Sequence, residues 1–305
     1  MSFFTPPKNV FLISIVFFVA LAGACANYDR FVVPVVPLPD ANYVGSEECA
    51  VCHEDVFEYY RRTVHYKVRD FEVAGRERGC EGCHGPGSAH IAEKGKIEFI
   101  IGFNRLTAAQ SSSICLKCHS GGPLSGWYSN LHALSDVGCN NCHKSHKVTT
   151  EKMLYKGEPD LCYDCHQQLQ TRMQFPSHHP VREGKMKCSD CHTTHGVESE
   201  VLTQMNVNAL CYECHAEKQG PFLYEHSPVE EDCNLCHDPH GTIANNLLKQ
   251  SDPFLCLRCH RGHRGHDIPG STPSLPSLLT SCIQCHSQVH GSDLPSQLGG
   301  RGLTR

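Results

Sequence analysis

The chain has 305 residues, and its 27 lysines and arginines against 32 aspartates and glutamates give a formal net charge of −5. A surface with this balance does not attract nucleic acid, so we expect no nucleic-acid partner. The 21 cysteines and 22 histidines exceed what an ordinary globular domain uses, and their spacing carries most of the prediction.

Residues 1–24 are predicted to be a secretory signal peptide. Lys8 precedes an apolar run that ends at Ala24, and the run is shorter than the about 20 residues of a membrane-spanning helix. An uncleaved anchor stays an alternative. Residues 25–43 contain several prolines and are predicted to be an extended tether.

Cys25 has two interpretations. The stretch that begins at Leu21 resembles a bacterial lipoprotein box, which would make Cys25 a lipidated first residue and a membrane anchor. The three residues Ala22-Gly23-Ala24 also form an ordinary signal-peptide cleavage site, after which Cys25 would have no special role.

The motif Cys-x-x-Cys-His occurs ten times from residue 49 onward. Two cysteines three apart lie on one side of a helical turn, where both thiols can bond one haem while the adjacent histidine ligates the iron. Zinc sites and disulfide scaffolds do not need a histidine after every second cysteine, so the motifs predict ten c-type haems. The predicted thioether residues are Cys49, Cys52, Cys80, Cys83, Cys115, Cys118, Cys139, Cys142, Cys162, Cys165, Cys188, Cys191, Cys211, Cys214, Cys233, Cys236, Cys256, Cys259, Cys282 and Cys285. The predicted proximal ligands are His53, His84, His119, His143, His166, His192, His215, His237, His260 and His286.

Twelve further histidines are candidates for the second, distal ligand of each iron. They are His65, His90, His132, His146, His178, His179, His195, His226, His240, His263, His266 and His290. One member of the pair His178/His179 and one of His263/His266 is surplus, which leaves ten candidates for ten irons. His146, His195 and His240 follow a proximal histidine by three residues, too near to reach the same iron, so we expect them to ligate a different haem. Methionine, the other common distal ligand, occurs only five times, which favours bis-histidine ligation.

The histidines and motifs repeat as a module of a first motif, a lone histidine, a second motif and a trailing histidine. Five such modules, at about 44–108, 109–155, 156–204, 205–250 and 251–296, divide a predicted decahaem domain over residues 44–305. The expected fold class is a haem-dominated multihaem cytochrome c, an elongated row of two-haem modules with short α-helices, irregular loops and almost no β structure. The longest helices are predicted over Glu54–Tyr66 and Leu161–Met173.

Two segments, Tyr43 to His53 and Cys80 to His90, together with the ten motifs, resemble the decahaem c-type cytochromes of the DmsE/MtrA type, a porin–cytochrome conduit family. The resemblance implies a chain of bis-histidine haems in the periplasm, associated with the outer membrane through a β-barrel porin. It implies a periplasmic or inner-membrane cytochrome as donor and an extracellular multihaem cytochrome or terminal reductase as acceptor. The direction of electron flow stays open.

The leading functional prediction is therefore an electron carrier with no catalytic residues and no substrate turnover of its own. One alternative is a multihaem reductase of nitrite or a similar oxyanion. Such an enzyme needs an iron with an open position, often marked by an altered motif, and none of the ten motifs is altered. A second alternative is a subunit of a cytochrome filament.

Overall fold

The computed structural model describes residues 40–67, 79–148, 150–196, 201–260, 281–295 and 303. The expected signal peptide, Cys25, most of the expected tether, and both His263 and His266 lie outside these residues. The chain divides into two compact units, Met1–Gly157 with Thr194–Ser199, and Glu158–Thr193 with Glu200–Arg305. Among the described residues, none of the helices has the length and apolar character needed to cross a membrane.

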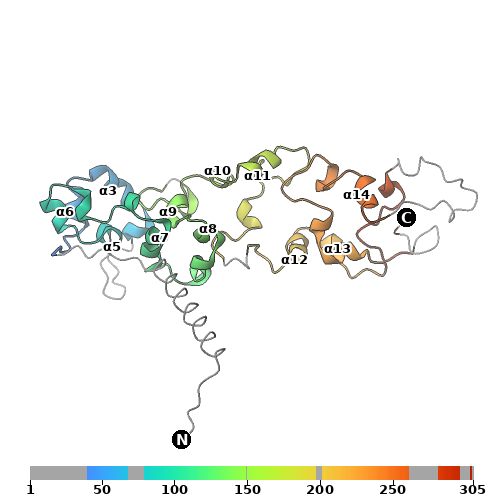
Figure 1. Ribbon diagram of the computed structural model, residues 1–305, viewed down its shortest axis with the longest axis horizontal. Helices are drawn as coiled ribbons and strands as arrows, with labels where there is room; N and C mark the ends of the chain where they lie inside the picture. The colour runs from blue at the N-terminus through green and yellow to red at the C-terminus, as the bar shows by residue number, and fades with distance from the viewer. Residues whose placement is uncertain are drawn as a thin grey trace, which may run out of the picture. The chain divides into compact units, whose positions relative to one another are not determined.

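Short helices carry each unit, and Figure 1 labels them along the chain. The first unit contains α2 (Ser46–Ala50), α3 (Glu54–Tyr60), α4 (Val64–Lys67), α5 (Cys80–His84), α6 (Ser88–Ala92), η1 (Ile97–Phe99), η2 (Phe103–Arg105), α7 (Ala108–Leu116), η3 (Gly122–Leu124), η4 (Trp127–Ser129), α8 (Leu131–Leu134), α9 (Cys139–Cys142) and η5 (Glu151–Met153). The second contains α10 (Asp160–Tyr163), α11 (Gln167–Arg172), η6 (Cys188–Asp190), α12 (Val207–Tyr212), η8 (Ala216–Lys218), α13 (Ser227–Glu231), η9 (Cys233–Leu235), η10 (Asn245–Leu247), α14 (Phe254–Leu257) and η12 (Cys282–Gln284).

Local capping starts several of these helices. Thr107 and Gln110 form a capping box at the start of α7, which is nine residues long. Asn206 accepts a hydrogen bond from the backbone N–H of Ala209 at 2.8 Å and caps α12 in the same way. Such caps satisfy backbone groups that a short helix leaves unpaired at its first turn.

Both of the longer helices expected from the sequence are divided in two, so their predicted continuity is wrong. The first breaks between α3 and α4 at Thr63, whose hydroxyl donates to the Tyr60 carbonyl and accepts from the Tyr66 N–H, which favours a new helix start. The second breaks between α10 and α11 at His166, whose backbone leaves the helical region with φ −91° and ψ 54°.

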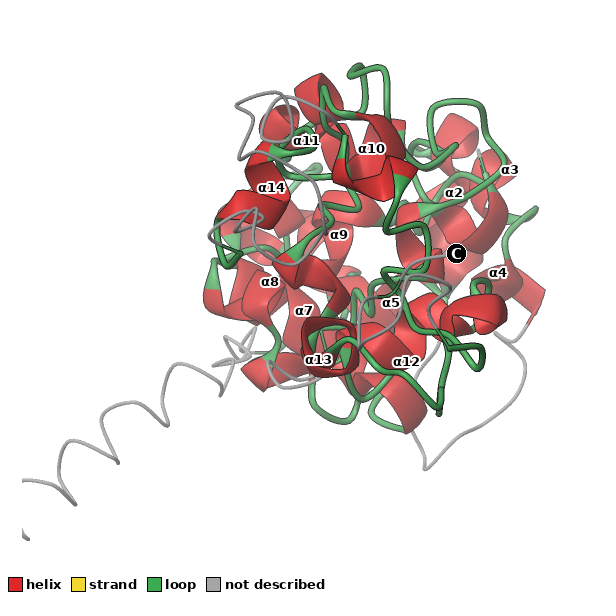
Figure 2. Ribbon diagram, turned by 90° about the vertical axis from the view of Figure 1, so that its right-hand side faces the viewer, coloured by secondary structure: helices red, strands yellow, loops and turns green. Residues whose placement is uncertain are grey.

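The described residues form isolated antiparallel bridges rather than a sheet, as the sequence predicts. Figure 2 shows helices joined by loops, with no strand drawn. Three bridges are equivalent: His143, His192 and His237 each pair with a leucine in the loop that follows the motif. The chain therefore folds back on each of these motifs at the same point.

Apolar packing between side chains is sparse. The buried hydrophobic residues of the described chain are Tyr60, Ile114, Trp127, Met173, Val181 and Ala244. Helices α7 and α9 pack together in the first unit, and α12 packs against η9 in the second. These pairings join the two motifs of one module, so the helices position motifs rather than enclose a large hydrophobic core.

Candidate haem-binding sites

Each motif closes one helical turn. The proximal histidine N–H donates to the carbonyl of the first cysteine, for example His53 to Cys49 at 3.0 Å and His237 to Cys233 at 3.0 Å. The turn places both cysteine side chains on one side, as the sequence predicts, because residues three apart are neighbours on a helix. A porphyrin bonded through two thioethers requires this arrangement.

The first cysteines of the two motifs in one module lie side by side in all five modules. The hydrogen-bonded thiol pairs are Cys49–Cys80, Cys115–Cys139, Cys162–Cys188, Cys211–Cys233 and Cys256–Cys282. The hydrogen bond with Cys49 lowers the pKa of the Cys80 thiol to about 6, and it raises the pKa of Cys49. Haem attachment converts these thiols to thioethers, so the feature that persists is the spacing of the two sulfurs.

The second cysteines meet between modules. Burial raises the pKa of Cys83, and the nearby thiol of Cys118 raises it further. The pairs Cys191–Cys214 and Cys236–Cys259 interact in the same way. Within each unit, successive motifs therefore approach one another in alternation, first cysteine to first within a module and second to second between modules.

Histidine rings form pairs whose separation fits axial ligation of one iron. Two imidazole–metal bonds of about 2 Å on opposite sides of a metal separate the ring centres by roughly 6 Å. In the first unit the pairs are His53–His90 at 6.4 Å, His65–His119 at 6.0 Å, His84–His146 at 5.8 Å and His143–His195 at 6.0 Å. In the second they are His179–His215 at 6.4 Å, His192–His240 at 6.0 Å, His226–His260 at 6.1 Å and His237–His290 at 6.2 Å. Every pair joins one predicted proximal histidine to one predicted distal candidate.

The trailing histidines lie beside the second motif of the preceding module rather than beside their own. His146 reaches His84, and His240 reaches His192. This geometry agrees with the expectation that a trailing histidine serves a different haem. It also means that one module cannot complete its axial pairs without the next.

Hydrogen bonds fix the tautomer of many of these rings. Nδ1 lies 2.8 Å from the Ile101 carbonyl in His84, 2.9 Å from the Lys96 carbonyl in His90 and 2.9 Å from the Val289 carbonyl in His226. A carbonyl only accepts, so Nδ1 carries the proton and Nε2 keeps its lone pair for a metal. His132 makes the same contact, with Nδ1 3.4 Å from the Thr194 carbonyl.

Burial also favours the neutral, ligating form of several distal candidates. It lowers their pKa, and neighbouring positive groups, the paired proximal ring among them, lower it further. The residues concerned are His65, His146, His195, His240 and His290. Neutral imidazole is the form that binds a metal.

The structure separates His178 from His179. His178 has both ring nitrogens engaged, with Nδ1 2.6 Å from the Phe175 carbonyl and Nε2 3.2 Å from Glu183. His179 instead bonds the Pro239 carbonyl through Nδ1 at 2.9 Å and pairs with His215. Only His179 therefore has a ring nitrogen directed to a proximal partner.

A further recurring contact, which the sequence analysis missed, latches the two motifs of each module together. A polar side chain three or four residues before the first cysteine accepts a hydrogen bond from the backbone at the start of the second motif. The latch residues are Ser46 to Cys80 N at 3.2 Å, Ser112 to Cys139 N at 3.2 Å, Glu158 to Ser189 N at 2.9 Å, Asn208 to Cys233 N at 2.8 Å, and Asp252 to Cys282 N. Their recurrence at one offset from the motif is a signal that the sequence contains.

Comparison with known proteins agrees with this arrangement. A family model described as a doubled CXXCH motif matches residues 132–171, 178–220 and 226–265, and each match begins near a distal candidate and spans two motifs. The multihaem cytochrome MtrA of Shewanella baltica is 36% identical over 269 residues, covering 83% of this chain and 80% of that protein. The cytochrome c-type protein NrfB of Escherichia coli O6:H1 is 28% identical over 102 residues, covering 32% of this chain and 53% of that protein.

Proposed function

Because the chain belongs to the family of the multihaem cytochrome MtrA, it is a c-type cytochrome that transfers electrons, and we propose that its ten motifs hold ten haems in one continuous series. A bound haem supplies one-electron chemistry at its iron. The motif cysteines hold each group covalently, and the motif histidine supplies the proximal ligand. The paired histidine supplies the distal ligand.

The alternation of sulfur contacts carries this proposal. In the first unit it links the four motifs from Cys49 to Cys139, and in the second it links the six motifs from Cys162 to Cys282. Thioether sulfurs sit at the porphyrin edge, so neighbouring sulfurs bring neighbouring porphyrin edges together. Electron tunnelling falls off steeply with distance, which makes edge-to-edge contact the arrangement that favours conduction.

The histidine pairs support electron transfer over substrate chemistry. Eight proximal histidines have a paired ring at the spacing of a shared iron. We assign the distal ligands as His90, His146, His65, His195, His240, His179, His290 and His226 for the irons of His53, His84, His119, His143, His192, His215, His237 and His260. An iron with two protein ligands offers no free position to a substrate such as nitrite.

The cellular setting is proposed from kinship with MtrA and from the leader predicted at the N-terminus. The protein would work in the periplasm in association with the outer membrane, exported by residues 1–24 and, if Cys25 is lipidated, held there by its lipid. Its partners would be an outer-membrane β-barrel porin, a periplasmic or inner-membrane cytochrome donor, and an extracellular multihaem cytochrome or terminal reductase. Large barrels have lumens wide enough to hold a protein plug.

Two measurements on the full protein test the proposal. Mass spectrometry and haem quantitation should give ten haems per chain, and electron paramagnetic resonance with carbon monoxide addition should detect only low-spin, ligand-resistant iron. A high-spin, carbon-monoxide-binding haem in the intact protein would contradict a pure electron carrier.

Transport across a membrane needs a separate assay. The protein is co-expressed with a candidate barrel, reconstituted into liposomes that enclose reduced methyl viologen, and exposed to an external ferric acceptor. Oxidation of the enclosed dye should require both proteins. Equal oxidation with the barrel alone would remove the conduit function, while the haem count would still stand.

A further inference from the structure

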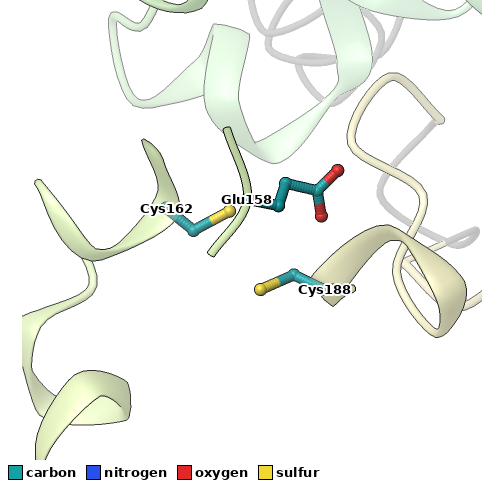
Figure 3. Close-up of side chains that lie close together, drawn as sticks. All are labelled: Glu158, Cys162 and Cys188. Carbon is teal, nitrogen blue, oxygen red and sulfur yellow. The ribbon is translucent and has the colours of Figure 1, made fainter. Parts of the chain in front are cut away.

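The five latch residues differ in charge. Ser46, Ser112 and Asn208 are neutral, whereas Glu158 and Asp252 are carboxylates. Among the described residues, only these two modules bring a carboxylate oxygen and both first-cysteine sulfurs within 4.8 Å of one another. Figure 3 shows Glu158, Cys162 and Cys188 converging from separate segments of the chain.

Both carboxylates are held in place. Glu158 accepts from the Ser189 N–H at 2.9 Å and from the Ser189 hydroxyl at 2.8 Å, so its two oxygens are each fixed by the second motif. Asp252 accepts from the Cys256 thiol at 3.4 Å. Burial alone would raise the pKa of Asp252, but hydrogen bonds from Ser281, Cys282 and Cys256 outweigh it and lower the pKa, so the group stays ionised near neutral pH.

A carboxylate beside two cysteines is also the donor set of a metal site. In this chain both cysteines belong to haem-attachment motifs, and a thioether sulfur is a much weaker ligand for zinc than a thiolate. With those sulfurs bonded to two porphyrins, the carboxylate instead faces the edges where the two groups meet.

We propose that Glu158 and Asp252 lower the reduction potentials of the haem pairs attached to the third and fifth modules. The proposal rests on haem attachment at these motifs, as set out under the proposed function. Reduction adds negative charge to the iron centre, and a fixed negative charge nearby disfavours that step. The neutral latches of the other modules hold their motifs together without this charge, so pairs of lower potential would alternate with other pairs along the chain.

The test replaces each carboxylate by its neutral isostere, Glu158→Gln and Asp252→Asn, in the full haem-loaded protein. The amide keeps an oxygen that accepts the backbone hydrogen bond, so charge changes while the latch remains. Spectroelectrochemical titration should show the amplitude of two of the ten haems moving to higher potential in each variant, and of four in the double variant. We expect a roughly tenfold change in the reduced-to-oxidised ratio of those haems, about 59 mV for a one-electron couple.

Glu98→Gln is the matched control, because Glu98 is exposed and lies outside every latch. Its titration should superimpose on that of the unmodified protein. Glu158→Ala, which removes charge and hydrogen bond together, should move the same two haems and also lower stability.

Unchanged potentials in Glu158→Gln and Asp252→Asn, with haem count and low-spin signals intact, would overturn the proposal and leave the electron-transfer function standing. Absence of haem from the third and fifth modules of the unmodified protein would instead remove both.

Discussion

Gly241 is the position at which the structure predicts the largest effect of a single added methyl group. Its φ of +135° is strained for any L-residue, and a Cβ there would lie 2.9 Å from the carbonyl carbon of Arg172 and closer still to its oxygen. The backbone strain costs about 1–3 kcal/mol. Overpacking against a backbone carbonyl adds a further cost of about 1–3 kcal/mol. We therefore expect Gly241→Ala to lose about 2–6 kcal/mol of unfolding free energy.

Two other glycines separate these contributions. Gly184 has φ +70° but open space around a Cβ, so Gly184→Ala isolates the strain and should cost about 1–2 kcal/mol. Gly121 has φ −105° and open space, so Gly121→Ala should be neutral or stabilise the fold by about 0.4–1 kcal/mol.

Guanidinium unfolding of the haem-loaded protein, followed by the Soret band and by far-ultraviolet circular dichroism, measures the series. The order of midpoints should be Gly121→Ala, then Gly184→Ala, then Gly241→Ala. Because His240 precedes Gly241 and pairs with His192 at 6.0 Å, the third variant should also weaken one low-spin signal. A Gly241→Ala protein with the midpoint of Gly121→Ala and all its low-spin signals would refute the reasoning.

Three further outcomes follow from the site geometry. His179→Ala should convert one haem to a high-spin, carbon-monoxide-binding form, whereas His178→Ala should leave the electron paramagnetic resonance spectrum unchanged; the reverse result would exchange the two assignments. The ring of His65 is turned by 77° from its partner, against 9–27° in six other pairs, so the iron orbitals directed at the two rings stay nearly equal in energy. One low-spin signal should therefore be far more anisotropic than most, and His65→Ala should remove it; its persistence would contradict the assignment. Ser112→Ala should destabilise the protein by about 1 kcal/mol in urea unfolding, because Cys139 N–H loses its acceptor, while an unchanged midpoint would show that the latch adds no stability.

Much of the site follows directly from local sequence. A cysteine pair three apart and the next histidine must share one helical turn, so the motif alone specifies the attachment chemistry, and the helix-and-loop character follows from its repetition. The sequence also predicts that a trailing histidine such as His146 serves another haem, because three residues of chain cannot wrap a porphyrin. The length of the helices was less predictable, since Thr63 and His166 interrupt runs with suitable composition.

Other features depend on residues that are distant in the sequence. Whether His178 or His179 ligates depends on Glu183 and on the Pro239 carbonyl, which is 60 residues from His179. The latches depend on two motifs meeting, and only that meeting brings Glu158 to a pair of sulfurs. Sequence by itself determined how many haem-attachment motifs the protein carries and the chemistry of each one, because that information lies within five consecutive residues. Tertiary structure alone decided which histidine faces which motif and where charge lies beside them, because those contacts form only when separate modules pack together.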